Sequence, residues 1–281
     1  MNNFHSNQIM HVTNVTLRVK DIERMLAFYL GFLKMTLIIQ KDNAYFLGTS
    51  SKNVLVILIE EKEAIRAAKT VGLYHYALLL PTRHDLGVFF NYLLATNFDL
   101  GGASDHDVSE ALYLQDPEGN GSEIYIDRLA KDWKFNGQQV VMTSQPLNYR
   151  TLLKEQGEYA QLPADTKMGH LHLHVNDISV AQRFFVETLG FAKMLDYGPS
   201  ASFISTGHYH HHIAFNTWLG SNRPALGPHQ TGMVAYEINV PSSLKDALIE
   251  RLKKEKIAYS YTDNVISLYD INQTRVNIVI N

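Results

Sequence analysis

The sequence predicts an α+β fold made of four copies of one module, in which a strand is followed by a helix and three further strands. The order of these elements recurs four times along the 281 residues. The turn that ends the first helix, Tyr29–Phe32 (YLGF), returns as Thr188–Phe191 (TLGF). Asp116–Gly119 occupies the place in the second copy that Asp270–Gln273 takes in the fourth. One such sheet cannot cover its own concave face, so the copies are expected to pair into two cup-shaped half-barrels.

The first module is predicted to span residues 9–66. His11–Val19 alternates apolar and polar residues and is rich in β-branched side chains, which is typical of a strand. Lys20-Asp21 supplies a cap for a short amphipathic helix, Ile22–Gly31, which a glycine ends. The three remaining strands are expected at about Met35–Gln40, Ala44–Gly48 and Val54–Glu60.

The second module, residues 71–128, ends in a predicted hairpin. The turn Asp116–Gly121 combines Pro, which presets φ, with Gly and Asn, which tolerate the left-handed region. In the strand after it, Glu123 and Tyr125 share one face. A carboxylate in mid-strand needs a partner, because burying an unpaired charge is costly. The other elements are strands at Leu73–Leu80, Phe98–Leu100 and Glu110–Gln115, the closing strand Ser122–Asp127, and a helix at Leu86–Thr96.

The third and fourth modules, residues 168–222 and 230–281, repeat this order. Residues 129–167, between the second and third modules (the inner modules), are mixed in pattern and polar. They are expected to form a linker with one helix near Arg150–Gln156. The third module is expected to contain Gly169–Val175, a helix at Ile178–Leu189, and strands near Ala192–Tyr197, Ser202–Ser205 and His211–Thr217. The fourth is expected to contain Gly232–Val240, a helix at Leu244–Lys256, and strands at Ser267–Tyr269 and Val276–Ile280.

Composition narrows the classes of function. A net charge of −3 shows no basic footprint, so nucleic acid is not an expected partner. The chain has no cysteine, which leaves imidazole and carboxylate as the metal ligands on offer. No apolar run approaches the length of a membrane span, and residues 1–10 are polar and unlike a signal peptide. The expected compartment is the cytoplasm.

Of the thirteen histidines, seven cluster at 170–174 and 208–212. When the opening strands are aligned on their last apolar residue, His75 and His170 occupy equivalent positions in the second and third modules. Asn14 and Ala235 take that place in the first and fourth. The inner modules thus offer two histidines and Glu123, a composition that favours Fe(II). A lone histidine in an apolar strand is more often a core residue, and the conjunction of all three is what favours a metal site. It also requires module two to pair with three, and one with four.

Two further groups of histidines lie in the predicted third module. His172 and His174 share a face with His170, so they cannot all be primary ligands. His208–His212 leads into a short apolar strand that should aim one face into the same cup. Imidazole is the usual group for moving protons near neutral pH. The alternative for this second cluster is a solvent-exposed edge.

These residues resemble the vicinal oxygen chelate superfamily, and within it the type I extradiol ring-cleaving dioxygenases of the catechol 2,3-dioxygenase group. The most specific stretches are GLYHYALLLP, SDHDVSEALYLQDPEGNGSEIYIDR, GHLHLHV and YHHHIAFNTW. Members usually carry their ligands in modules three and four, whereas here they fall in two and three. The resemblance implies metal ligands His75, His170 and Glu123, the acid–base residue His211 (with His210 and His212 as alternatives), the catalytic Tyr113, and substrate contacts from His106, His172 and His212.

The implied function is Fe(II)-dependent cleavage of a catechol-type ring with O₂ to a 2-hydroxymuconic semialdehyde-type product, with Mn(II) as the alternative metal. Partners would be a small aromatic diol and O₂, with no nucleic acid and no membrane, and a homo-oligomer is compatible with the sequence. Two other functions stay open within the superfamily. One is a glyoxalase-like metal-dependent lyase or isomerase with a fourth ligand such as His212. The other is a non-catalytic protein that sequesters a small molecule.

Overall fold

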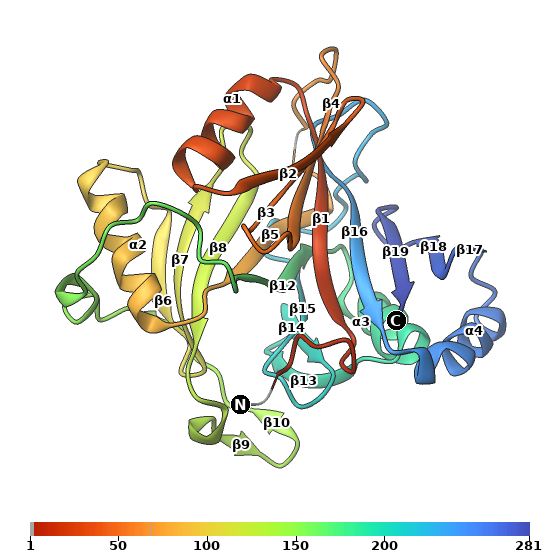
Figure 1. Ribbon diagram of the computed structural model, residues 1–281. Coiled ribbons are helices and arrows are strands. Elements are labelled where there is room, and N and C mark those ends of the chain that lie inside the picture. The colour runs from red at the N-terminus through yellow and green to blue at the C-terminus, as the bar shows by residue number, and fades with distance from the viewer. Residues whose placement is uncertain (1–2, 68) are drawn as a thin grey trace.

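The computed structural model describes residues 3–67 and 69–281, in which two large curled sheets pack together with helices on their outer faces (Figure 1). Met1 and Asn2, the start of the polar segment 1–10, lie outside the described residues. The fold class predicted from the sequence is confirmed: the chain is α+β and forms half-barrels from four repeated modules.

One sheet is built from the first and last modules and is called the outer sheet for their place in the chain. Its strand order is β17-β18-β19-β16-β1-β4-β3-β2. At its centre β1 runs antiparallel to β16, although the two strands come from opposite ends of the chain (Figure 1). Its elements are β1 His11–Val19, α1 Ile22–Leu26 with a π-helical turn Ala27–Phe32, β2 Thr36–Lys41, β3 Ala44–Gly48, β4 Val54–Glu60, β16 Gly232–Val240, the 3₁₀ turn Ser242–Leu244, α4 Lys245–Lys254, β17 Ser260–Thr262, β18 Val265–Tyr269 and β19 Arg275–Ile280.

The inner sheet joins the second and third modules, in the order β11-β6-β7-β8-β5-β12-β15-β14-β13. Here β5 runs antiparallel to β12, with His75 opposite His172. Its elements are β5 Gly72–Leu79, α2 Arg83–Ala95, β6 Gly102–Asp105, β7 Ser109–Gln115, β8 Gly121–Asp127, β11 Gln145–Pro146, β12 Lys167–His174, α3 Ile178–Gln182 with a π-helical turn Arg183–Leu189, β13 Ala192–Tyr197, β14 Ala201–Ser205 and β15 Ile213–Asn216.

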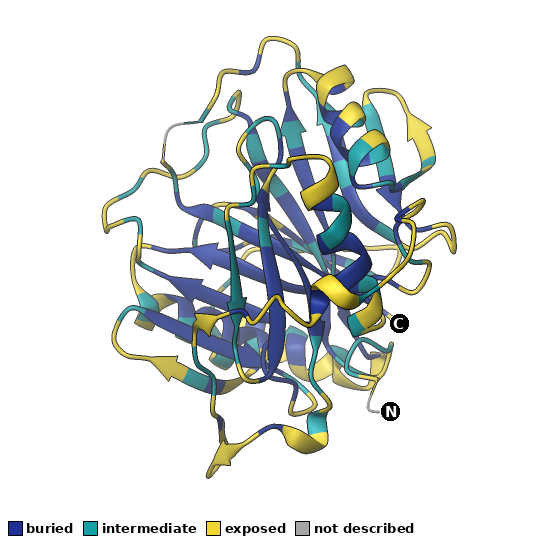
Figure 2. Ribbon diagram, turned by 90° about the vertical axis from the view of Figure 1, so that its left-hand side faces the viewer, coloured by how far each residue is buried: buried dark blue, intermediate teal, exposed yellow. Residues whose placement is uncertain are grey.

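One apolar core holds side chains from the opening strands of all four modules and from the helices above them. Leu17, Leu78, Leu173 and Ile238 belong to it, one from each opening strand. Figure 2 shows the buried strands enclosed by helices whose outer faces are exposed. No helix in the described part of the chain has the length and apolarity needed to cross a membrane.

The segment between the inner modules differs from the expected linker helix. It contains the short strands β9 Phe135–Asn136, β10 Gln139–Val140 and β11, a 3₁₀ turn at Ala130–Asp132 and another at Leu152–Lys154. The second turn does not extend over 150–156, because Asn91 of α2 donates through Nδ2 to the carbonyls of Leu152 and Glu155, at 3.4 and 2.7 Å. Phe98–Leu100 also differs from expectation: it packs on the core without strand pairing, and the edge strand begins at Gly102.

The two turns that the sequence identifies as equivalent are anchored by the same device. Asp270 accepts from the backbone amides of Asn272 and Thr274, at 2.8 and 2.9 Å, and from the hydroxyl of Tyr236 at 3.0 Å. Asp116 is bound in the same way, with Tyr29 donating to it at 3.0 Å. Each carboxyl is buried. Burial raises the pKa of Asp116, and it raises the pKa of Asp270 to about 6.

The buried carboxyl of Asp270 predicts a stability that depends on pH. Because the pKa of Asp270 is about 6 when folded, above its ordinary 3.8, the folded state binds the proton more tightly. The contribution of Asp270 to stability is therefore fully present below about pH 4 and is lost as the pH rises through 6, by on the order of 2–3 kcal/mol. Asp270→Asn should remove this part of the pH dependence, because an amide does not titrate. The turn should persist, because the amide oxygen can still accept both backbone hydrogen bonds. Urea unfolding from pH 4 to 7 measures it, with the exposed Asp263→Asn as control. An Asp270→Asn profile parallel to wild type would contradict the prediction.

Candidate metal centre and substrate cavity

Ala77 on β5 is the point around which three polar side chains converge. Across one edge of β5 it pairs with Glu123 of the parallel strand β8, and across the other with His170 of the antiparallel strand β12. His75 lies two residues before Ala77 and so projects from the same face. Because the side chain of Ala77 is a single methyl, it leaves room above itself for the three larger groups.

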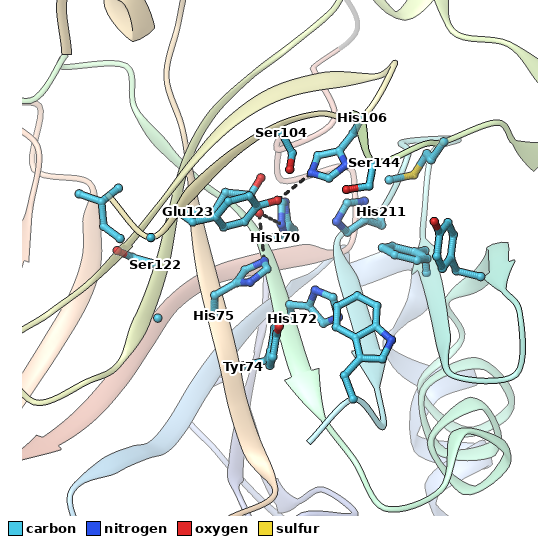
Figure 3. A pocket seen from close by; sticks show the side chains of 18 of the residues that line it. Tyr74, His75, Ser104, His106, Ser122, Glu123, Ser144, His170, His172 and His211 are labelled. Carbon is cyan, nitrogen blue, oxygen red and sulfur yellow. Dashed lines mark hydrogen bonds and ion pairs between the residues drawn. The ribbon is translucent and has the colours of Figure 1, made fainter. Parts of the chain in front are cut away.

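The three groups lie close enough to hold one metal ion. Oε2 of Glu123 is 3.0 Å from Nε2 of His75 and 3.3 Å from Nε2 of His170, and one ligand atom from each of the three lies within 4.8 Å of the others. Figure 3 shows Glu123 between the two imidazoles. In the described part of the chain this is the sole group of three or more such side chains with this spacing.

The chemistry of these groups fits a divalent cation. Nε2 of His75 is buried and lies 3.0 Å from Oε2 of Glu123, but it makes no aligned hydrogen bond, so its lone pair is free to bind a metal. Burial alone would raise the pKa of Glu123, but His170 and His75 beside it hold that pKa well below its usual range. An ionised carboxylate between two imidazole nitrogens, all three residues less than 8% exposed, is a donor set suited to a divalent metal ion.

Tyr113 of β7 faces Glu123 across the β7–β8 pair, and His106 fixes its hydroxyl. Nδ1 of His106 lies 2.8 Å from the carbonyl of Thr143, which can only accept, so this nitrogen carries the proton. In the neutral ring Nε2 then accepts, and the hydroxyl of Tyr113 donates to it at 2.7 Å. Burial raises the pKa of Tyr113 well above its usual value. Tyr113 therefore keeps its proton and presents oxygen lone pairs to the cavity.

Of the three consecutive histidines before β15, His211 lines the cavity (Figure 3). Its Nδ1 is 2.8 Å from Nδ1 of His210, and Nε2 of His210 is 2.8 Å from Oδ1 of Asp127. A carboxylate only accepts, so His210 carries its proton on Nε2 and accepts from Nδ1–H of His211. Nε2 of His211 is thereby left unprotonated. Burial holds the pKa of His211 well below its usual value, which keeps the ring neutral.

The structure does not bring His212 into the cavity, which differs from the expectation that it contacts substrate. Side chains alternate along this extended segment, so His212 points away from the face that His211 lines. Nε2 of His212 lies 2.9 Å from the carbonyl of Phe4, and the amide of Thr206 donates to its Nδ1 at 3.3 Å. Both ring nitrogens are thus occupied by backbone groups.

His172 and His106, for which substrate contacts are expected, both line the cavity. Asn216 places its Nδ2 2.8 Å from Nε2 of His172, and the amide nitrogen can only donate, so this ring nitrogen accepts. The cavity encloses about 680 Å³ above the three candidate ligands. Sequence reasoning missed part of its wall, namely Tyr74, Met142, Thr143, Ser144, Leu195, Tyr197, Phe203, Trp218 and Leu219.

The linker residues in this wall lie beside the cavity because β11 pairs with β6, with Gln145 opposite Asp105. Thr143 also donates to Asp107 at 2.8 Å. The linker lies outside the repeat, so repeat symmetry carries no signal for it. Trp218 could have been found, because it lies two residues beyond Asn216 at the end of an alternating strand.

Comparison with known proteins agrees with this architecture. Residues 8–124 match the model of the Glyoxalase/Bleomycin resistance protein/Dioxygenase superfamily. The chain is 36% identical over 267 residues to catechol-2,3-dioxygenase of Bacillus subtilis (strain 168), covering 92% of this chain and 93% of that protein. Among solved structures, it is similar in fold to a candidate dioxygenase of Bacillus subtilis (12% identity, TM-score 0.66, 98% of this chain and 86% of the other). It is also similar to glyoxalase I of Zea mays (13% identity, TM-score 0.57, 96% and 92%). The chain belongs to the glyoxalase/bleomycin resistance protein/dioxygenase superfamily.

Proposed function

We propose that this protein is an extradiol dioxygenase that cleaves a catechol-type ring with O₂ to a 2-hydroxymuconic semialdehyde-type product. The observation that carries the proposal is a set of three buried candidate ligands, His75, His170 and Glu123, at the base of a large cavity. Three protein ligands leave coordination positions for a diol and for oxygen. The 36% identity to a catechol-2,3-dioxygenase supports the same reaction.

In this proposal His75, His170 and Glu123 hold Fe(II), which supplies Lewis acidity toward the diol and the electron transfer that the reaction with O₂ requires. His211 takes a proton from a substrate hydroxyl at its unprotonated Nε2 and returns it later. The oxygen of Tyr113 accepts a hydrogen bond from the substrate, because its own proton is committed to His106. His172 and His106 border the bound ring and fix its orientation.

The two other functions open at the sequence level receive less support. A glyoxalase-like lyase would need a fourth protein ligand, and His212, the residue expected for that role, faces the backbone of Phe4 and Thr206. A protein that only sequesters a ligand has no use for an ionised carboxylate buried between two imidazoles, because such a group costs stability unless it is paired. The geometry therefore favours the dioxygenase.

The test is an assay of the purified protein loaded with Fe(II), or with Mn(II), under argon and then given catechol. Admitting air should produce a yellow ring-opened product, and withholding oxygen should prevent it. The metal that gives the higher rate is the one that supports the reaction better. Absence of ring cleavage with both metals, or turnover without oxygen, would refute the proposal. The proposed compartment is the cytoplasm, where reducing conditions keep iron ferrous, and a homo-oligomer stays a prediction.

A further inference from the structure

The cavity has two chemically different walls. The wall that the third module supplies is apolar and aromatic, with Leu195, Tyr197, Phe203 and Trp218. The opposite wall presents hydroxyl and amide groups from β6, β7 and the linker. No lysine or arginine is among the residues that line either wall in the described structure.

The cationic side chains next to these walls in sequence are engaged elsewhere. Arg128 pairs with Asp105 and with Glu110, and Lys193 pairs with Asp196. Arg223, which follows the lining residue Leu219, donates through Nε at 2.9 Å to the carbonyl of Leu219. A negatively charged substituent that lies away from the candidate metal ligands would therefore lose water without meeting a lysine or arginine, which is costly.

Trp218 is held rigidly although its side chain is half exposed. Its Nε1 donates to the hydroxyl of Ser200 at 3.2 Å, and its backbone amide donates to Asn216 at 3.0 Å. The indole ring lies 5.4 Å from the ring of His172 and 5.5 Å from that of Tyr74. Because its only N–H is already used, the indole offers a ligand an apolar face and no polar group. Tyr197 lines the same wall and is 48% exposed, so two large, half-exposed aromatic side chains border the cavity.

The cavity is also larger than an unsubstituted diol needs. Its volume of about 680 Å³ falls in the range of roughly 300–1,000 Å³ seen for sites that enclose drug-sized ligands. A diol placed against His75, His170 and Glu123 leaves the space toward Trp218 and Tyr197 unfilled. That space is bounded by rings that gain from apolar contact.

We infer that the site selects catechols that carry an uncharged apolar substituent, which packs on Trp218 and Tyr197, and disfavours catechols that carry a carboxylate. This inference rests on the proposed ring-cleaving function and names its substrate class. Trp218 is then a residue that determines specificity. It acts by offering apolar surface to the substituent, and it has no part in the chemistry at the diol.

Binding to the Fe(II)-loaded protein under argon tests this inference without turnover. Four ligands are compared by calorimetry: catechol, 4-ethylcatechol, (3,4-dihydroxyphenyl)acetate and the methyl ester of that acid. We expect the acid to bind on the order of tenfold more weakly than its ester, because the ester differs chiefly in lacking the charge. We expect 4-ethylcatechol to bind several-fold more tightly than catechol. An acid that binds as tightly as its ester overturns the inference.

Two variants of Trp218 test separately the apolar contact with the substituent and the effect of adding a positive charge to this wall. Trp218→Ala should reduce the advantage of 4-ethylcatechol over catechol, and Trp218→Arg should narrow or reverse the gap between ester and acid. Tyr269→Ala, which removes an exposed aromatic side chain from the outer sheet, is the control and should change neither ratio. Ratios that stay at wild-type values in both Trp218 variants overturn the role of this residue.

Turnover under air then distinguishes a failure of the inferred substrate preference from a failure of the proposed ring-cleaving function. If all three substituted compounds are cleaved and the acid is cleaved as efficiently as its ester, the inference fails and the proposed function stands. If none of the compounds and no catechol is bound or cleaved, the proposed function itself fails, and the inference fails with it.

Discussion

Replacing Glu123 by alanine is expected to abolish ring cleavage and metal retention while the fold persists. Glu123 is the single carboxylate among the candidate ligands, and its loss leaves a metal cation with two imidazoles and no anionic protein ligand. Removing only an outer partner of a metal ligand typically costs about 10–100-fold in metal affinity, so removing a ligand should cost more than ~100-fold. The apolar core does not include this side chain, which is why folding should survive.

The measurement combines metal content after dialysis with thermal unfolding. A metal that binds only the folded state raises its stability, so Fe(II) added under argon should raise the Tm of wild type and leave that of Glu123→Ala unchanged. Glu237→Ala is the matched control, because Glu237 projects from β16 of the outer sheet, where Thr13 donates to it at 2.7 Å. A Glu123→Ala protein that keeps iron and full activity would show that the metal lies elsewhere.

The second large effect is expected at His211. His211→Asn should lower kcat by about 10²–10⁴-fold, which is the usual contribution of a positioned acid–base group, while metal content stays at the wild-type level. Its neighbour supplies the control: His212→Asn changes a residue whose ring nitrogens face the backbone, so kcat per folded molecule should change little. A larger fall in kcat for His212→Asn than for His211→Asn would reverse the assignment.

Asp127→Asn examines how His211 is held. The amide no longer requires Nε2 of His210 to carry a proton, so the bond between His210 and His211 loses its fixed direction. We expect a partial fall in kcat with little change in KM, because Asp127 does not line the cavity. A change in KM alone would instead indicate a structural effect on the cavity wall.

The convergence of His75, His170 and Glu123 could be predicted because it depends on repeat register. Equivalent positions in two opening strands meet when those strands pair, and the closing strand of the second module lies beside its opening strand. The position of His212 was harder to predict, because a shift of one residue in an extended segment exchanges the two faces. The metal, the roles of the residues and the substrate stay predictions.

Other features were not accessible from the sequence for physical reasons. The segment at Phe98–Leu100 has the apolar side chains of a strand, yet it pairs with no strand: its side chains pack on the core, and the amide of Phe98 donates to the carbonyl of Leu93 at the end of α2. The linker becomes part of the cavity wall through tertiary contacts, such as the bond between His106 and the carbonyl of Thr143, that no local pattern encodes. Trp218 was available in the sequence, but its importance depends on the neighbours that the fold brings beside it.

The nested pairing of the modules also sets the order in which this protein can assemble during synthesis. The strands of the inner sheet leave the ribosome before β16 does, so the candidate ligands can meet early. By contrast β1, among the first segments made, must wait for a strand near the opposite end of the chain. Until then one of its edges lacks its native partner, and unpaired strand edges promote aggregation. A chain truncated after β15 would therefore keep all three ligands and still be prone to aggregate.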